Sequence, residues 1–357
     1  MSRPGAVGAV EQAFGPRYWP GRRLPDASAL VSVVGVGGAA ATVESAGAGA
    51  RALADGVALP RHPSDGLLER WLWLAEVGAA DLSVARLYEG HVDALAILDE
   101  ARHPVEASRL YGVWASKAGG SAVSVTDDGP HLVLDGVRPY ASGAGTIDIA
   151  LVAVDRGEDA LLVAVDLRAP GVSVEDGSWV AIGMAGSDSA TVHLRDVRVD
   201  ARNIVGTPGW YLDRPGFWPG AVGVAACWFG GAVGVVQPLV QAAVDGSLDE
   251  HGLAHLGRTW ARLEAAAALL VSTADDLDEG RHASSTDSRR SAETVRAVVE
   301  DVAGACIAAT GRALGPGPMT GDRVHAQRVA DLEVYVRQHH AERDLAALGR
   351  LLGAAPW

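Results

Sequence analysis

The chain has 357 residues, 48% of them hydrophobic, which is enough for a large core divided into two or three packed units. Its formal net charge of -14 argues against nucleic acid or another polyanion as a partner. Residues 1–15 lack the basic and then apolar pattern of an export signal, and Cys227 and Cys306 lie in apolar stretches. We therefore expect a cytoplasmic protein with buried free thiols rather than a disulfide.

Residues 1–110 are predicted to form an N-terminal helical domain. The clearest helical spacing lies in residues 67–100, where apolar side chains recur every three or four positions. Earlier, an apolar run ends in Gly35, Gly37 and Ala40, the spacing of a turn that can hold a dinucleotide pyrophosphate at a helix N-terminus. No clear second strand ending in an acidic residue follows, so we favour a helix or loop of small residues over a dinucleotide site.

Residues 111–206 change character and are predicted to form a β-domain. Short apolar runs alternate here with turns that contain glycine and aspartate, as is typical of strands. The expected strands are Ala122–Thr126, His131–Leu134, Ile149–Val154, Leu161–Val165 and Thr191–Leu194. An order of helices, then strands, then helices indicates an α+β fold rather than a doubly wound sheet.

Residues 207–357 are predicted to form a C-terminal helical bundle. The stretch from Pro215 to Val244 contains no charged residue and is long enough on paper to span a membrane. It is also dense in glycine, no second stretch of this kind exists in the sequence, and no basic cluster flanks it. We therefore expect a helix buried inside the bundle, where small residues allow close approach, and no membrane insertion.

Several stretches of the sequence resemble motifs of the acyl-CoA dehydrogenases. In Leu134–Gly143, a strand is followed by a glycine, a basic residue, an aromatic residue and a hydroxyl residue. The segment Trp179–Gly206 is similar to the end of that family's β-domain, and Arg328 with Asp331 matches a late helix of its bundle. In this order and spacing the motifs are fairly specific, and the resemblance covers about residues 65–352.

This resemblance implies a helical N-terminal domain, a small β-barrel-like domain and a C-terminal four-helix bundle, with FAD held between the last two. It also implies a homodimer or homotetramer whose subunits complete the flavin site together. The residues that we expect to hold the cofactor are Trp114, Ser142, Gly143, Arg258 and Gly315. Ser142 and Gly143 would hydrogen-bond the reactive edge of the flavin, and Trp114 would stack on a ring face.

Other interpretations stay open for these positions. Ser142 can equally be a serine of a turn, and for Trp114 we slightly favour a core aromatic. The Thr-Glu-Pro flavin motif of the family is replaced here by the segment Trp114–Lys117. Arg258 stands in for the family's pyrophosphate-binding arginine, which has no direct match between Gln241 and Arg258.

The end of the chain carries two adjacent histidines, His339 and His340. One helical face before and at the first of them holds Leu332, Tyr335, Val336 and His339. A later apolar stripe, which points roughly the opposite way, holds Leu345, Leu348 and Leu352. A single straight helix cannot bury both stripes, so we predict a break near the histidines, with His339 facing inward. His340 is expected to be exposed or paired with Asp344.

His339 is the candidate catalytic base. In the resembling dehydrogenases a glutamate commonly follows the aspartate of the Arg-x-x-Asp motif by eight residues, and counting from Asp331 this place is His339. An imidazole can take a proton near neutral pH, and the related reduced-flavin monooxygenases keep a histidine in this region. Glu250 and Glu264 are the alternatives for a base on an earlier helix. The non-catalytic interpretation is a histidine packed at a helix C-terminus.

The predicted function is that of an FAD-dependent oxidoreductase acting on a small molecule, with an acyl thioester as the candidate substrate. A base would remove a proton next to a carbonyl while the flavin accepts a hydride. The alternatives are a reduced-flavin-dependent monooxygenase of the same fold, and a non-catalytic relative that serves as a binding or assembly subunit. The sequence has no metal-ligand spacing, and His91 is expected to be a hydrogen-bonded core histidine.

Overall fold

The computed structural model describes residues 42–57, 59, 66–116, 120, 122–281 and 284–353. The candidate dinucleotide turn at Gly35 and Gly37 lies outside these residues. The first three described helices are α3 (Val43–Gly56), α4 (Leu67–Ala80) and α5 (Leu82–Glu100). Thr42 and Ser45 form a reciprocal capping box that fixes the start of α3.

A single residue separates α4 from α5. Asp81 has an extended backbone, with φ of -156° and ψ of 119°, and its side chain accepts a hydrogen bond from the Val84 N–H. It therefore ends α4 and caps the N-terminus of α5, so that the helical spacing expected over residues 67–100 belongs to two consecutive helices.

The middle of the chain forms one sheet of eight strands, in which most neighbours are antiparallel. The strands are β1 (Tyr111–Trp114), β2 (Val123–Asp128), β3 (His131–Ala141), β4 (Ile149–Arg156), β5 (Asp159–Asp166), β6 (Val172–Val174), β7 (Ala190–Asp200) and β8 (Ile204–Val205). Their order is β6-β7-β3-β2-β4-β5-β8, and β1 pairs in parallel with β4.

The five expected strands all lie in this sheet, whereas β1, β6 and β8 were not predicted. The third strand, β3, also runs seven residues further than Leu134, because a shift of register between Leu134 and Gly136 lets it continue on β7. Such a bulge breaks the alternation of apolar and polar residues, so the pattern in the sequence ends before the strand does.

The rest of the described chain is helical. The helices are α6 (Trp210–Asp213), α7 (Phe217–Val244), α8 (Glu250–Asp278), α9 (Ser285–Leu314), α10 (Gly317–Gly321), α11 (Arg323–Tyr335) and α12 (Glu342–Gly353). The central helix α7 packs against α4, α5, α8, α9 and α11. In the described residues α7 is the one helix long and apolar enough to cross a membrane, and 83% of its most apolar window is buried. The prediction of a helix buried in a bundle is therefore confirmed.

Small residues let α4 and α7 touch backbone to backbone. A Cβ atom added to Gly230 would lie 1.9 Å from the carbonyl oxygen of Ala75, and one added to Gly78 would lie 2.4 Å from the carbonyl oxygen of Cys227. Neither distance is compatible with a real side chain, so glycine is required at both crossings. Cys227 and Cys306 are free and buried, as expected.

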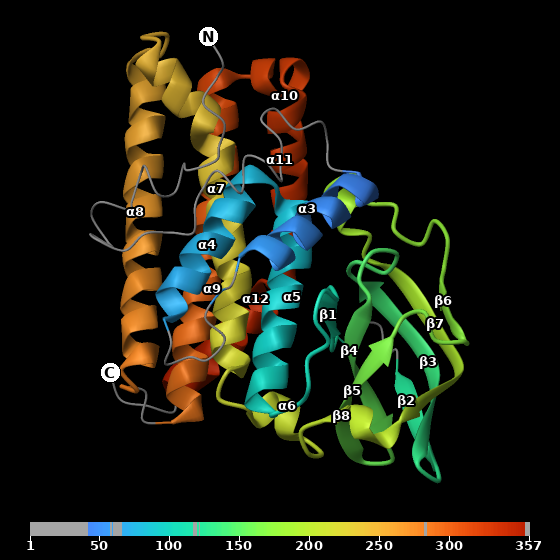
Figure 1. Cartoon of the computed structure of the whole chain (residues 1–357). Coiled ribbons are helices and arrows are strands. Elements are labelled where there is room, and N and C mark those ends of the chain that lie inside the picture. Colours follow the sequence, from blue (N-terminus) through green and yellow to red (C-terminus); the bar gives the residue numbers. More distant parts are fainter. Residues whose placement is uncertain are drawn as a thin grey trace.

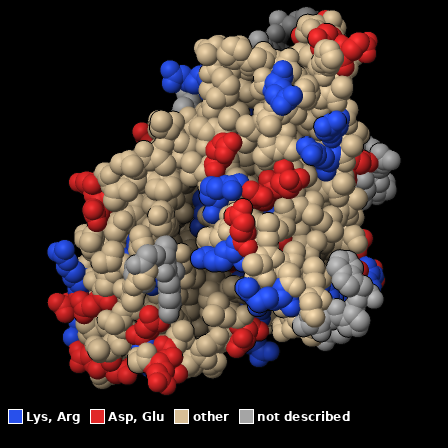
Figure 2. All heavy atoms as spheres, turned by 180° about the vertical axis from the view of Figure 1, so that it is seen from behind, with Lys and Arg blue, Asp and Glu red and all other residues tan. Residues whose placement is uncertain are grey.

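Figure 1 shows the sheet to one side of the helices, with α3 and α5 next to it. The α+β class is therefore confirmed, while the limits of the three predicted domains stay a prediction. On the opposite face of the molecule, acidic and basic side chains alternate around a hollow between the helices and the sheet (Figure 2).

Candidate functional site

The predicted break near the two histidines is present. Helix α11 ends at Tyr335, one short 3-10 turn follows over Val336–Gln338, and α12 begins at Glu342. His339 has an extended backbone, with φ of -83° and ψ of 119°, and Ala341 lies in the left-handed region with φ of 46°. These conformations turn the chain and point His339 inward.

His339 is almost fully buried, with 3% of its surface exposed. Among the described residues its Nδ1 has no hydrogen-bond partner. Burial is the main cause that lowers the pKa of His339 below its usual value, so the imidazole is neutral at pH 7. A neutral imidazole can donate one hydrogen bond and accept another, which suits contact with a ligand.

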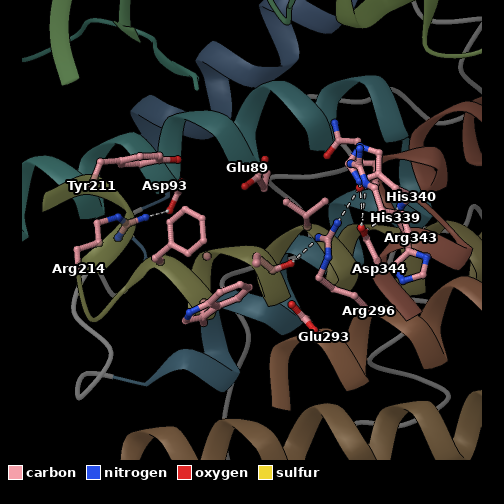
Figure 3. A pocket seen from close by; sticks show the side chains of 16 residues that line it. Glu89, Asp93, Tyr211, Arg214, Glu293, Arg296, His339, His340, Arg343 and Asp344 are labelled. Atoms are coloured by element: carbon pink, nitrogen blue, oxygen red, sulfur yellow. Dashed lines mark hydrogen bonds and ion pairs between the residues drawn. The ribbon is translucent and has the colours of Figure 1, made fainter. Parts of the chain in front are cut away.

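His339 lies in the wall of a cavity of about 450 Å³. This volume is in the range of small-molecule and cofactor sites. We call this cavity the His339 pocket, and its wall comes from α5, the segment from α6 into α7, α9, the turn before α12 and the start of α12 (Figure 3). Its residues are Glu89, Asp93, Tyr211, Arg214, Phe217, Trp218, Gly220, Ala221, Val224, Glu293, Arg296, Gln338, His339, His340, Arg343 and Asp344.

Glu89 points into the His339 pocket from α5 (Figure 3). Only 4% of its surface is exposed, and its Oε2 accepts a hydrogen bond of 2.6 Å from Nη1 of Arg86. Burial raises the pKa of Glu89 to about 7, against the opposing effect of Arg86. Glu89 was not predicted from the sequence. The available signal was the helical spacing of Arg86, Glu89 and Asp93 within Leu82–Leu98, a stretch whose other residues are mostly apolar.

Arg296 fixes the turn that carries His339. Its Nη1 donates to the Ala221 carbonyl at 3.0 Å, and its Nη2 donates to the Gln338 carbonyl at 3.0 Å. The guanidinium also lies over the ring of Trp228, 4.7 Å from the centroid. Arg296 thus ties α9, α7 and the residue before His339 together, and it was also missed in the sequence.

The other end of the pocket is held by a buried ion network. Arg214 donates to Glu100 at 3.0 Å and to Asp93 at 3.1 Å, and its side chain is only 2% exposed. These contacts anchor the segment between α6 and α7 to α5. Phe217 and Trp218 follow directly and pack edge to face, with ring centroids 5.1 Å apart, so this wall is both aromatic and rigid.

Three of the predicted cofactor residues meet on the sheet, in a group that we call the serine cluster. Nε1 of Trp114 donates to the carbonyl oxygen of Ser142 at 3.1 Å. Oγ of Ser142 lies 2.8 Å from Oγ of Ser189, which in turn lies 3.0 Å from Oγ of Ser187. Trp114 is 3% exposed and belongs to the main hydrophobic core, which agrees with its interpretation as a core aromatic.

The backbone donors of the serine cluster are already bonded within the chain. The Ser142 N–H donates to the carbonyl of Tyr140 at 3.0 Å, and the Gly143 N–H donates to the carbonyl of Ser187 at 2.8 Å. Nε of Arg86 donates to Oγ of Ser142 at 3.2 Å, which connects the cluster to α5. A flavin would have to exchange these bonds, so the assignment of Ser142 and Gly143 to the cofactor stays a prediction.

The remaining predicted residues lie apart from both groups. Arg258 is exposed near the start of α8, and Gly315 ends α9 with φ of 65°. Neither lines the His339 pocket, and neither do the alternative bases Glu250 and Glu264. The roles of Arg258 and Gly315 in holding a cofactor stay predictions.

The expectations for the other histidines are confirmed. The backbone N–H of His340 donates to Asp344 at 2.9 Å, and its exposed ring lies 3.3 Å from the same carboxyl. His91 is buried and accepts a hydrogen bond of 3.1 Å from the Tyr111 N–H. Within the described ranges, no three His, Cys, Asp or Glu side chains gather as metal ligands do.

Comparison with solved structures identifies the fold. A dibenzothiophene monooxygenase (TdsC) from Paenibacillus sp. A11-2 aligns with a TM-score of 0.76 and 17% identity, over 98% of this chain and 97% of that chain. KijD3 in complex with FMN and a dTDP-linked 3-amino-4-keto sugar aligns with a TM-score of 0.71 and 17% identity, over 98% of this chain and 92% of that chain. A nitrososynthase from Micromonospora carbonacea var. africana aligns with a TM-score of 0.71 and 18% identity, over 98% of this chain and 96% of that chain. No family model and no curated protein matches the chain.

These structures have the fold of the acyl-CoA dehydrogenases, and the chain therefore has this fold, as the sequence motifs predicted. At identities of 16% to 18% the likeness defines the fold alone. Function has to be argued from the site, because one fold can carry many activities.

Proposed function

We propose that this protein is a flavin-dependent monooxygenase that uses reduced flavin and oxygen, and that the His339 pocket holds its small-molecule substrate. The observation that carries the proposal is the buried Nδ1 of His339, which has no hydrogen-bond partner among the described residues and lines a cavity of about 450 Å³. Buried polar atoms of native proteins are nearly always bonded, so an unpartnered one in a pocket wall indicates a contact with a ligand.

The protonation state of His339 favours this reaction over ordinary dehydrogenation. Burial lowers its pKa, so the imidazole is neutral and a weaker base than in water. Removal of a proton from carbon demands a strong, well-placed base, whereas orienting a substrate and holding a developing charge needs a neutral donor or acceptor. The position that the resembling dehydrogenases give to a glutamate therefore carries a group better suited to hydrogen bonding.

The solved structures support the same class of reaction. TdsC is named a dibenzothiophene monooxygenase and has been solved with FMN and indole. KijD3 has been solved with FMN and an amino sugar nucleotide, and a third neighbour is named a nitrososynthase. We extend to this chain the two features that are named together for TdsC, a bound FMN and monooxygenation.

The residues present fit a flavin and a substrate together. The pocket offers aromatic walls at Phe217 and Trp218, and an unpartnered imidazole at its inner end. On the sheet side, Trp114 and the serine cluster would border the flavin at the position that the resemblance gives them, while their own polar groups stay bonded within the chain. When bound, reduced flavin supplies the two electrons with which one oxygen atom enters the substrate and the other leaves as water. FMN is the flavin found in the TdsC and KijD3 structures, whereas FAD is the flavin that the sequence resemblance implies.

The chain's own residues would bind and orient the substrate and keep water out. His339 would hydrogen-bond the reacting group of the substrate and keep it in place. Arg296 would hold the turn that carries His339, through its bonds to the carbonyls of Ala221 and Gln338. The aromatic wall at Phe217 and Trp218 would exclude water from the reacting groups, which suppresses side reactions.

Dehydrogenation is the second candidate, and Glu89 is the observation that favours it. Its carboxyl group lines the same pocket and burial raises its pKa to about 7, which makes it a stronger base than a free glutamate. In this case Glu89 would take the proton next to a carbonyl of an acyl thioester.

The larger organisation is part of the proposal. We propose a helical N-terminal domain over residues 1–110, a β-domain over 111–206 and a helical bundle over 207–357. We further propose a cytoplasmic homodimer or homotetramer, because the resemblance to the acyl-CoA dehydrogenases implies subunits that complete the flavin site together.

The test is a titration of the whole protein with oxidised and reduced FMN and FAD, followed by two reactions. Octanoyl-CoA is added without oxygen, and oxygen with indole as a first probe is added to the reduced complex. We expect binding of reduced flavin, no bleaching of oxidised flavin by the thioester, and oxygen-dependent chemistry. Bleaching of the oxidised flavin by octanoyl-CoA would contradict monooxygenation and favour dehydrogenation as the function. If no flavin binds, the function would be that of a non-catalytic binding subunit.

A further inference from the structure

Glu89 occupies a place in the His339 pocket that a structural carboxylate rarely has. It lies on α5, across the cavity from the turn that carries His339 (Figure 3). Its side chain is 5% exposed, and its one hydrogen bond to another described residue joins Oε2 to Arg86. A buried carboxyl group with one oxygen held and the group facing a cavity is arranged to meet a ligand.

Arg86 connects this carboxyl group to the sheet. Its Nη1 donates to Oε2 of Glu89 at 2.6 Å, and its Nε donates to Oγ of Ser142 at 3.2 Å. The side chain of Arg86 thus spans from the pocket to the serine cluster, between the regions where the substrate and the flavin are proposed to lie. A fixed arginine orients the carboxylate, and the bond to Ser142 fixes the arginine.

The charges around Glu89 come from five neighbouring helices as well as its own. The titratable and charged groups that face it are Arg70 of α4, Arg86 and Asp93 of α5, Tyr211 of α6, Cys227 of α7, Arg296 of α9 and Tyr335 of α11. The three arginines favour the carboxylate, whereas burial and Asp93 favour the protonated acid. These opposing effects bring the two forms close in free energy at neutral pH.

We propose that Glu89 is an acid–base residue of the His339 pocket, with Arg86 as its positioning residue. In the proposed step, the Glu89 carboxylate takes a proton from an N–H, O–H or C–H acid of the substrate. The bond from that proton to the substrate breaks, its electron pair stays on the substrate, and a new O–H bond forms on the carboxyl group. The substrate class is therefore a small molecule with an acidic proton at its reacting atom, which His339 holds from the other wall. This inference rests on the proposed function only for what happens to the substrate after Glu89 has taken its proton.

The first experiment is an infrared titration of the whole protein, without any cofactor, that follows the carbonyl stretch of a protonated carboxylic acid. Because burial raises the pKa of Glu89 to about 7, the band should persist well above the pH at which exposed carboxyl groups ionise. The part of the band that titrates near pH 7 should be absent in Glu89→Gln and retained in Glu89→Asp, whereas the contributions of Asp81 and Asp331, whose pKa values burial also raises, should remain in both variants. The part that titrates near pH 7 should also be retained in Glu293→Gln, which removes another carboxyl group from the same pocket. Loss of this part in Glu293→Gln, or its survival in Glu89→Gln, would overturn the proposal.

The second experiment measures how fast oxygen reoxidises protein-bound reduced FMN as a function of pH. This reaction consumes one proton for each reduced flavin anion that is converted to oxidised flavin and hydrogen peroxide. General acid catalysis typically contributes a factor of 100 or more, so we expect Glu89→Gln to slow reoxidation at least about tenfold near pH 6 and to flatten its pH profile. Glu89→Asp should restore a pH-dependent profile. A variant profile that matches the wild type would contradict the role of Glu89.

The two experiments separate the two ways in which the account can fail. A protein that shows the Glu89 band but binds no flavin contradicts the proposed function and leaves the proton-exchanging carboxyl group in place. A protein that binds reduced flavin but shows no part of the band that titrates near pH 7 and depends on Glu89 contradicts the inference on Glu89 alone.

Discussion

The His339 pocket and the serine cluster both bury polar groups, yet they treat them in opposite ways. In the serine cluster the hydroxyl groups of Ser142, Ser187 and Ser189 bond to one another, and the N–H groups of Ser142 and Gly143 bond to carbonyls of the chain. In the pocket, Nδ1 of His339 has no partner among the described residues, and burial shifts the pKa of Glu89 to about 7.

This difference separates structure from function. In a polar group that is fully hydrogen-bonded within the protein, these bonds offset the free-energy cost of burial, and no ligand is needed. An unsatisfied one leaves that cost uncompensated unless a ligand completes it, and shifted pKa values accumulate at such places. The sequence motifs led to the serine cluster and to His339, whereas the other polar groups of the pocket are recognised from the structure alone.

The largest effect is expected from removing the imidazole of the pocket. His339→Ala should lower kcat/KM about 100-fold, the usual contribution of a residue that moves or holds a proton, with the flavin still bound. Product formation from the oxygen-dependent reaction measures this. The matched control is His193→Ala, a histidine of β7 paired with Glu175 on the sheet. Equal activity of the two variants would remove His339 from the mechanism.

Gly143 tests how tightly the serine cluster is packed. Its φ is 73°, and a Cβ atom there would lie 2.7 Å from Cγ2 of Ile147 and 3.0 Å from Cδ2 of Leu87. Gly143→Ala should therefore lower the free energy of unfolding by about 2–3 kcal/mol, from strain and overpacking together. Gly129→Ala has a similar φ of 65° but an open surrounding, and should cost about 1 kcal/mol in the same urea titration. Equal losses would show that the cluster has room for a ligand.

The pH dependence of stability should carry the signature of Glu89. Burial raises the pKa of Glu89 in the folded state from its ordinary 4.5 to about 7, so the folded state binds the proton more tightly. The stabilisation from this group is fully present below about pH 4.5 and is lost as the pH rises to about 7, by on the order of 3 kcal/mol. His339 has a lowered pKa, so it acts with the opposite sign and adds stability as the pH rises towards 6.5.

Urea titrations from pH 4 to pH 8 measure this prediction, with Glu89→Gln as the comparison. The difference in unfolding free energy between wild type and variant should change across the window between the two pKa values and be constant outside it. A constant difference throughout would mean that Glu89 titrates like an exposed carboxyl group.

Ser142→Ala should have a smaller effect and one confined to folding. It removes the contact with Ser189 and the bond from Arg86, which should cost about 1 kcal/mol of stability. Because the hydroxyl group is committed inside the protein, we expect the Kd for FMN to stay within about threefold. A tenfold weaker Kd at unchanged stability would instead establish the cofactor contact predicted from sequence.

Arg258→Ala should change stability least, by less than about 0.5 kcal/mol, because the side chain is exposed near the start of α8. Its predicted contact with the pyrophosphate of FAD would then have to form across a subunit interface. Weaker binding of FAD but not of FMN to the variant, at an unchanged oligomeric state, would support that contact.

Local patterns in the sequence predicted a good part of this molecule. The opposed apolar stripes around His339 predicted the break between α11 and α12, and the spacing of His340 and Asp344 predicted their pairing. The uncharged stretch after Pro215 predicted a buried helix. Each of these depends on residues close together in the chain, where periodicity and spacing decide the outcome.

The pocket could not be predicted in the same way. Glu89 faces the turn of His339 only because α5 and α11 both pack on α7, and Arg296 reaches Gln338 from 42 positions away in the chain. A glutamate inside a helix is ordinarily a solvent-exposed residue, so its burial is set by tertiary packing rather than by its neighbours in sequence. The bulged end of β3 was missed for a related reason, since pairing with β7 carries that strand past Gly136.

The central claim is that the His339 pocket, and not the serine cluster, controls the chemistry of a reduced flavin. The most direct measurement is the rate of oxygen-dependent product formation by the wild type, His339→Ala and Ser142→Ala with reduced FMN bound. We expect a rate lowered at least about tenfold in His339→Ala and unchanged within about twofold in Ser142→Ala. The reverse pattern, equal rates in all three proteins, or no binding of reduced FMN would contradict it.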